Sequence, residues 1–216
     1  MKELPILFST PMVQAIIEDR KEMTRRTAGL DHINIIPESW ICLDLNENGF
    51  MKFFNEKANL KTSAKPRYQV GDILWVKETF SFAPLTKETK PFYPELSDYI
   101  YKAGSNFISV KWKSSLFMPK KASRLWLEIT SIKCERLKDI TNKDAFAEGI
   151  EWKIKYPEES PETKYYRDYM FNDRFWAGEY FNAKNSFFTL WKKINGNESL
   201  KSNPWVFVYS FKKINK

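Results

Sequence analysis

The segment RLWLEITSIKCERL, residues 124–137, is the clearest β-strand pattern in the sequence and sets the kind of fold the chain can adopt. Every second residue from Leu125 to Ile129 is apolar, which is the period of a strand with one face in a core. A helical pattern follows, because Thr141 and Asp144 resemble a capping box and Gly149 is typical of the residue after a helix. A strand followed directly by a short helix predicts a mixed α and β fold.

Similar patterns extend from this segment toward both ends of the chain. Near the N-terminus, Thr10 as the N-cap and Pro11 as the first helical residue predict a helix, and Gly71 with Asp72 predicts a turn before a strand. Phe187, like the apolar residues that follow it at helical spacing, is expected to face the core. The expected strands are PILFS, SWICLDL, FMKFF, ILWV and PWVFVYSFKKI, and the expected helices lie at about 11–20, 141–149 and 186–195.

The composition predicts one globular domain, residues 1–216, with an insertion at about 152–185. Of the 216 residues, 43% are hydrophobic and 16% aromatic, which supplies a sizeable core and argues against disorder. The insertion interleaves aromatic residues with charges, and from Tyr156 to Tyr180 it holds six acids against three bases. Interleaved aromatics can stack on bases, but the negative charge favours a surface loop held to the domain by its rings.

The few histidines and cysteines limit the chemistry that the chain can perform. His32 is the single histidine, so a zinc cluster of several His and Cys ligands is excluded and proton transfer falls to Lys, Asp, Glu or Tyr. Cys42 and Cys134 lie far apart in predicted strands, which fits reduced thiols better than a disulfide framework. No apolar run approaches the roughly 18–20 residues that span a bilayer, and a signal-peptide pattern is missing. We expect a cytoplasmic protein without membrane association, metal or cofactor.

The charge balance favours a polyanionic partner. The chain carries 35 Lys and Arg against 27 Asp and Glu, a formal net charge of +8. The stretch EDRKEMTRRT, residues 18–27, gathers Lys21, Thr24, Arg25 and Arg26, which together suit phosphate binding or activation of a hydroxyl. An ordinary structural explanation is also available, because cations after a helix end complement the helix dipole.

A second group of candidate binding residues lies around two of the predicted strands. Lys120, Lys121 and Arg124 form the best candidate phosphate contact outside residues 18–27. Glu78 follows the strand ILWV and is expected to pair with one of the two arginines of the first stretch. A solvated basic turn and a surface carboxylate are the alternative explanations.

The order of these motifs resembles the ASCH domain, a small β-barrel family of the PUA-like superfamily. The longer form, with tryptophan-rich connections and an insertion, looks like ASCH-domain proteins of phage and prophage genomes. The resemblance implies an α+β fold, a mixed PUA-like β-barrel with flanking helices and a long aromatic insertion. The matching stretches are PILFSTPMVQAIIEDRKEMTRR, YQVGDILWVKETF, MPKKASRLWLEITSIKCERLKDITNKDAFAEGI and NPWVFVYSF.

The resemblance also implies a site. PUA-like barrels commonly hold RNA or a modified base in a cleft between strands and flanking helices. One ASCH branch, the small bacterial acetylcytidine amidohydrolases, uses a lysine, a threonine and a glutamate at places that match Lys21, Thr24 and Glu148. This chain departs from that branch in its greater length and its aromatic insertions. The expected function is recognition of RNA or a modified nucleotide in a basic cleft and, if the protein is an enzyme, metal-independent hydrolysis of an acetylcytidine-type amide.

Several readings of this site stay open. In a hydrolase, Thr24 would be the nucleophile and Lys21 its base, provided that burial and the neighbouring arginines lower the lysine pKa against the effect of Glu148. In a binding protein, the cations would act as an electrostatic clamp while Glu148 reads an exocyclic amine. A metal-independent ribonuclease would use the same cleft. A mobile-element protein-interaction factor would instead use the insertion as its working surface, with a vestigial cleft.

Overall fold

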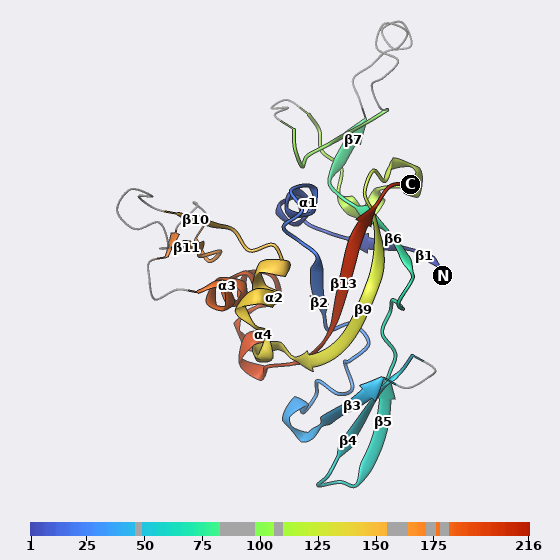
Figure 1. The fold of residues 1–216 in the computed structure, drawn as a ribbon, viewed down its shortest axis with the longest axis vertical. Coiled ribbons are helices and arrows are strands. Elements are labelled where there is room, and N and C mark those ends of the chain that lie inside the picture. The colour runs from blue at the N-terminus through green and yellow to red at the C-terminus, as the bar shows by residue number, and fades with distance from the viewer. Residues whose placement is uncertain (46–48, 83–97, 106–109, 155–163, 172–175, 178–181) are drawn as a thin grey trace, which may run out of the picture. The chain divides into compact units, whose positions relative to one another are not determined.

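The computed structural model describes residues 1–45, 49–82, 98–105, 110–154, 164–171, 176–177 and 182–216 (Figure 1). The chain forms two compact units, each assembled from separate segments. Unit 1 comprises Met1–Asp19, Gly71–Glu128 and Lys212–Lys216, and unit 2 comprises Arg20–Val70 and Ile129–Phe211. The expectation of a single domain stays a prediction.

Unit 1 is built around short strands from three parts of the chain. Strand β1 (Glu3–Leu7) runs parallel to β6 (Ile73–Lys77), and β6 runs antiparallel to the first residues of β9 (Trp126–Arg136). Strands β7 (Phe80–Phe82) and β8 (Tyr99–Tyr101) form a separate antiparallel pair. The alternation predicted for β9 is confirmed, because Leu127 and Ile129 are buried while Glu128 between them is only half-buried.

Helix α1 of unit 1 is shorter than the sequence predicted. It spans Thr10–Ile17, and its N-cap is Ser9 in place of the expected Thr10. The helix ends before residue 20 because Asp19 has a φ of 54°, in the left-handed region that stops an α-helix. Val13 and Ile16 are buried, as their spacing predicted.

Unit 2 contains the strands that position the candidate site. The remainder of β9, β13 (Trp205–Ile214) and β2 (Met23–Arg26) are neighbours in one sheet, and β13 runs antiparallel to β2. A separate antiparallel sheet follows the order β3 (Ile41–Leu45), β4 (Met51–Asn55) and β5 (Leu60–Ala64).

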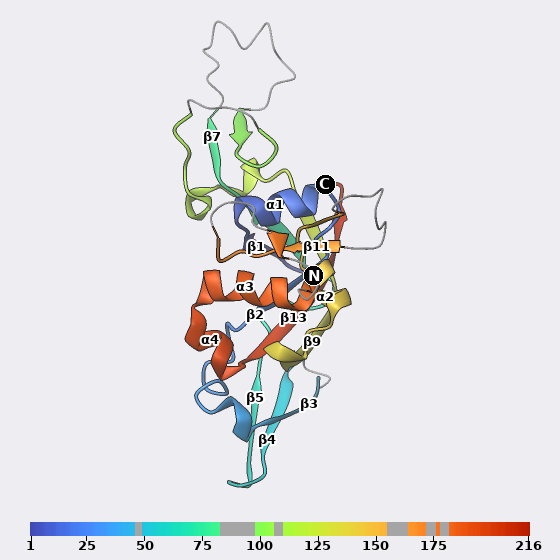
Figure 2. The ribbon, with the colours of Figure 1, turned by 90° about the vertical axis from the view of Figure 1, so that its left-hand side faces the viewer.

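Helices cover one face of β13 and β2 in unit 2 (Figure 2). Helix α2 spans Asn142–Ala147, α3 spans Ala183–Asn195 and α4 spans Asn197–Ser202. Phe187 and Trp191 of α3 are buried against the sheet, but Ile194 is 55% exposed, so the predicted apolar stripe is confirmed except at its last position. The core that these elements enclose contains Leu137, Ile140, Ala145, Ile150, Tyr169, Phe187, Trp191, Val206 and Val208.

The predicted insertion contains strands that the sequence did not indicate. Strands β10 (Trp152–Ile154), β11 (Lys164–Arg167) and β12 (Trp176–Ala177) form a small antiparallel sheet. Tyr169 is buried, and its hydroxyl accepts a hydrogen bond from the Glu151 backbone at 3.0 Å. Much of the predicted acidic and aromatic character lies outside the described residues, at Tyr156, Glu158, Glu159, Glu162, Asp173, Phe175, Glu179, Tyr180 and Phe181.

The mixed α and β composition predicted from the sequence is confirmed. Within the part of the chain that the structure describes, the strand pairings close no ring, so the PUA-like barrel stays a prediction. In the same described part, the helices all fall short of the length and apolar character needed to cross a membrane. Short 3-10 turns complete the elements, at η1 (Pro37–Ser39), η3 (Ser115–Phe117), η4 (Lys120–Ala122) and η5 (Leu137–Asp139).

The N-caps of α1 and α2 provide a test of how local sequence stabilises the fold. The Thr141 hydroxyl accepts a hydrogen bond from the Asp144 backbone at 3.0 Å, whereas the Ser9 side chain caps nothing. We expect Thr141→Ala to lower the free energy of unfolding by about 1 kcal/mol, because it leaves a helix N–H without a partner. Ser9→Ala, the matched control, should leave urea denaturation curves unchanged. Equal losses in the two variants would contradict the capping role of Thr141.

Candidate functional site

The candidate site lies where the start of β2 meets the end of α2 in unit 2. Lys21 stands just before β2 and forms an isolated antiparallel bridge with Glu148, the C-cap residue of α2. Gly149 follows with a φ of 89°, a left-handed conformation that glycine adopts without strain. The helix end expected at Gly149 is therefore confirmed, and it fixes where Glu148 lies.

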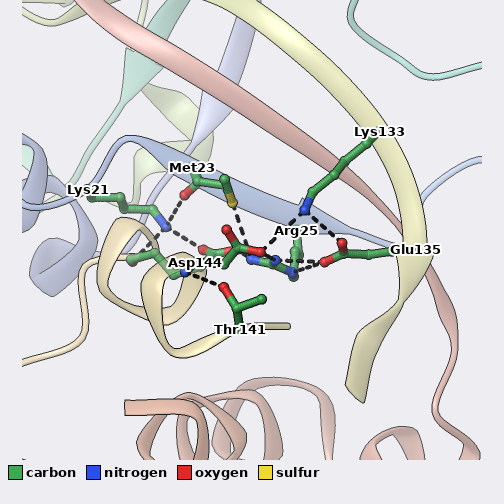
Figure 3. Close-up of polar contacts among 8 residues, drawn as sticks. Lys21, Met23, Arg25, Lys133, Glu135, Thr141 and Asp144 are labelled. Atoms are coloured by element: carbon green, nitrogen blue, oxygen red, sulfur yellow. Dashed lines mark hydrogen bonds and ion pairs between the residues drawn. The ribbon is translucent and has the colours of Figure 1, made fainter. Parts of the chain in front are cut away.

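The Lys21 amine is enclosed and fully hydrogen-bonded. Its side chain has no exposed surface, and Nζ donates to Glu148 Oε2 at 2.7 Å, to the Glu148 carbonyl at 2.9 Å and to the Met23 carbonyl at 2.8 Å. Figure 3 shows the amine turned toward the end of the helix. Burial lowers the pKa of Lys21, and the opposing effect of the Glu148 carboxylate does not cancel it.

Arg25 uses every N–H donor of its guanidinium inside the protein. Nε and Nη2 donate to Glu135 Oε1 at 3.1 and 2.7 Å, and Nη2 also donates to Asp144 Oδ2 at 3.1 Å. Nη1 donates to Glu148 Oε1 at 3.1 Å and to the Met23 sulfur at 3.4 Å. Because a guanidinium has five N–H groups and this side chain has no exposed surface, Arg25 has no donor left for a phosphate.

A second cation completes the charge pairing around Arg25. Lys133 Nζ lies 2.8 Å from Glu135 Oε2 and 3.3 Å from Asp144 Oδ2 (Figure 3). Burial acts to raise the pKa of Asp144, but Lys133 and Arg25 hold it below its ordinary value. Three cations and three carboxylates therefore balance one another. We call these six residues the Arg25 network: Lys21, Arg25, Lys133, Glu135, Asp144 and Glu148.

Thr24 and Arg26 lie on the other face of β2, because successive side chains of a strand point to opposite sides. Thr24 pairs in register with Tyr209 of β13 and is 3% exposed. Among the described residues its hydroxyl has no hydrogen-bond partner, so it contacts neither the Lys21 amine nor the Glu148 carboxylate by a hydrogen bond. Burial lowers the pKa of Arg26, with Glu148 and then Tyr68 among the groups that oppose the shift.

Two tyrosines stand near Arg26 on this second face. The rings of Tyr68 and Tyr209 meet edge to face with centroids 5.1 Å apart. The Tyr209 hydroxyl accepts a hydrogen bond from the Arg67 backbone at 3.1 Å. Burial raises the pKa of both tyrosines. This face therefore presents phenols beside a cation, and the cation is also close enough to Glu148 for that carboxylate to act on the Arg26 pKa.

The remaining predicted residues lie in unit 1. Glu78 is 1% exposed, and its carboxylate takes Arg124 as a bidentate partner, with both distances 2.9 Å, where the sequence predicted Arg25 or Arg26. Burial raises the pKa of Glu78, and Arg124 opposes that shift. Arg124 also donates to the Ala103 carbonyl at 2.8 Å and lies 4.2 Å from the Tyr101 ring centroid.

The basic turn before β9 has a different character. Lys120 forms an ion pair with Glu3 and lies 5.9 Å from the Trp126 ring centroid, while Lys121 is exposed. Of the predicted residues, the structure thus brings Lys21, Arg25 and Glu148 together in unit 2. In unit 1 it brings Glu78 and Arg124 together.

The sequence did not indicate Lys133, Glu135 or Asp144 as site residues, although a local signal was present. Lys133 and Glu135 are two residues apart in the strand RLWLEITSIKCERL, a spacing that puts both on one face. Asp144 and Glu148 are four apart in the helical pattern and also share a face. What the sequence lacked was any indication that these two faces meet at Arg25.

Within the described residues there is no group of three His, Cys, Asp or Glu side chains arranged to hold a metal ion. No protein-family model matches the chain, and neither the curated proteins nor the solved structures include a significant match. The resemblance to the ASCH domain therefore stays a prediction from the motifs.

Proposed function

We propose that this chain recognises a modified nucleotide, free or within RNA, through Thr24, Arg26 and Glu148, on a PUA-like barrel of the ASCH type. The observation that carries the proposal is the Thr24 hydroxyl, which makes no hydrogen bond within the described chain although the residue as a whole is only 3% exposed. A hydroxyl that makes no internal hydrogen bond keeps its donor and its acceptor lone pairs for another molecule. A ligand or an ordered water is the partner that completes this one.

The Arg25 network supports the proposal by fixing Glu148 in place. Within the part of the chain that the structure describes, each oxygen of the Glu148 carboxylate accepts one hydrogen bond, from Arg25 to Oε1 and from Lys21 to Oε2. A carboxylate oxygen has two lone pairs, so each keeps capacity for one further donor. We assign Glu148 the role of accepting a hydrogen bond from an exocyclic amine, and Arg25 a positioning role.

These groups define the class of ligand. Arg26 donates hydrogen bonds, the carboxylate accepts them, and the Thr24 hydroxyl does either. A planar base with a ring carbonyl beside an exocyclic amine or amide, as in cytidine and its acylated forms, matches this combination. The net charge of +8 favours an RNA strand over a neutral nucleoside, because the backbone adds attraction at low salt.

Hydrolysis of the acyl group is a second candidate, favoured by the lowered pKa of Lys21. In such a reaction the Thr24 oxygen attacks the acyl carbon and Lys21 takes the hydroxyl proton. The proton then passes to the departing amine, and water releases the acyl group from Thr24. This route requires a bound substrate to bring the Lys21 amine and the Thr24 hydroxyl together, because they share no hydrogen bond in the described structure.

A single methyl-for-hydroxyl exchange tests the proposal. We expect Thr24→Val to weaken binding of a short RNA that carries one acetylcytidine by about tenfold, the value of one lost hydrogen bond. The free energy of unfolding of the Thr24→Val variant should be unchanged, because no internal hydrogen bond is removed. Thr62→Val, a half-buried control on β5, should bind like the wild type. Titration by fluorescence anisotropy at several salt concentrations, with the unmodified RNA as reference, measures the effect.

The same samples decide between binding and hydrolysis. If the chain is a hydrolase, product analysis with a chelator present will show release of acetate, and Lys21→Met, Thr24→Val and Glu148→Gln will each reduce the rate at least about a hundredfold. Binding without turnover supports recognition alone. Equal, salt-independent affinity of the wild type for modified and unmodified RNA would overturn the proposal and favour the protein-interaction alternative.

A further inference from the structure

Cys42 and Cys134, which the sequence places far apart, meet in unit 2. Cys42 lies on β3 and Cys134 on β9, and their thiols share a hydrogen bond. The Cys42 thiol donates to the Leu43 carbonyl at 3.2 Å. Both cysteines are free and half-buried. The prediction of reduced thiols agrees with the free cysteines, but the sequence did not predict that the two side chains are neighbours.

The surrounding packing holds the two strands together at this point. Arg136, two residues beyond Cys134 on the same face of β9, donates to the Pro37 carbonyl at 3.0 Å, shortly before β3 begins. Phe53 is the register partner of Cys42, and its ring meets Trp205 edge-on at 5.5 Å. Anchors on both sides of the pair therefore restrict the motion that would separate the sulfurs.

We propose that Cys42 and Cys134 form a redox-active dithiol that closes into a disulfide between β3 and β9 when it meets a low-molecular-weight disulfide. The Cys42 thiolate attacks one sulfur of the small disulfide, which forms a mixed disulfide and releases one small thiolate. Cys134 then loses its proton to solvent and attacks the Cys42 sulfur, which releases the second small thiolate. Two protein thiols are oxidised, and one small disulfide is reduced to two thiols.

The environment assigns the order of attack. The hydrogen bond with Cys42 and burial both raise the pKa of Cys134, so this thiol is poorly ionised near neutral pH. Cys42 is therefore the residue that forms the mixed disulfide, and Cys134 is the residue that resolves it. The site is independent of the proposed nucleotide contact at Thr24.

Intact mass spectrometry after incubation with oxidised glutathione tests the pair directly. For the native wild type we expect a product that has lost two hydrogen atoms and carries no glutathione. For Cys134→Ser we expect one glutathione retained on Cys42, because the resolving thiol is gone. Cys42→Ser should react more slowly than Cys134→Ser, because burial still raises the pKa of the remaining Cys134 thiol after its contact with Cys42 is removed.

Stability supplies a second readout that needs no variant. A cross-link between residues far apart in sequence restricts the unfolded chain, so the oxidised wild type should melt several degrees above the reduced protein. Dithiothreitol should reverse both the mass change and the shift. Wild type that carries two glutathiones, or that stays fully reduced while a urea-unfolded sample reacts, would overturn the proposal.

Discussion

Replacing Arg25 by methionine is expected to lower the free energy of unfolding by about 3–5 kcal/mol, because it removes a cation from three carboxylates that have little contact with water. Of the ion-pair partners among the described residues, Glu135, Asp144 and Glu148 would keep Lys133 and Lys21. Methionine nearly fills the space of the arginine stem, so the loss measures charge and hydrogen bonding more than a cavity. Arg25→Lys should restore only part of the stability, since one ammonium cannot reach all three carboxylates.

Urea denaturation followed by circular dichroism measures these losses. The matched control is Lys201→Met, which removes an exposed cation that pairs with Glu198 on the surface of α4. No measurable change is expected there, because water replaces an exposed ion pair. If Arg25→Met were as stable as Lys201→Met, the Arg25 network would not be an essential part of the fold.

Replacing Arg124 by methionine should have the second-largest effect, and this effect should depend on pH. The variant leaves Glu78, 1% exposed, without its bidentate partner, and we expect a loss of about 2–4 kcal/mol at pH 7. Burial already raises the pKa of Glu78 above its ordinary value of 4.5, and removing Arg124 raises it further. A carboxyl whose pKa is raised on folding contributes its full stability below the unfolded pKa and loses it as pH rises through the folded pKa. The defect of Arg124→Met should therefore shrink as the pH falls toward 4.5.

A double variant separates the charge from the shape of this pair. Combining Arg124→Met with Glu78→Gln removes the unpaired charge, so the pH dependence of the difference from wild type should largely disappear. Lys212→Met, which removes the more exposed pair with Glu128, is the control and should change stability little at any pH. A defect in Arg124→Met that is equally large at pH 4.5 and pH 7 would show that Glu78 ionisation is not its cause.

Local sequence patterns predicted the elements of this fold correctly where residues a few positions apart determine the structure. The alternation at Leu127 and Ile129, the cap at Thr141 and the turn at Gly149 each depend on residues a few positions away, and the structure confirms them. The end of α1 was misplaced because helical spacing does not reveal a left-handed residue at position 19.

The contacts between distant segments could not be read in the same way. Periodicity assigns Lys133 and Asp144 to faces of their elements, but only the packing of α2 beside β9 and β2 makes those faces meet. The same limit applies to Cys42 and Cys134, whose contact depends on how β3 lies against β9. The roles of Lys21, Thr24 and Glu148 as a ligand site stay predictions from the sequence, now with a geometry that can be tested.

Because side chains alternate along β2, the pairing register of this short strand affects both the ion pairs and the proposed ligand contact. Thr24 and Arg25 are consecutive, and they serve opposite faces. A slip of β2 by one residue against β13 would turn the threonine toward three carboxylates and move the guanidinium away from them. In the shifted register, Arg25 would lose its carboxylate partners, and the proposed ligand contact at Thr24 would be misplaced as well. The shift that would remove the ligand contact would therefore also destabilise the fold, because it would remove the ion pairs of Arg25.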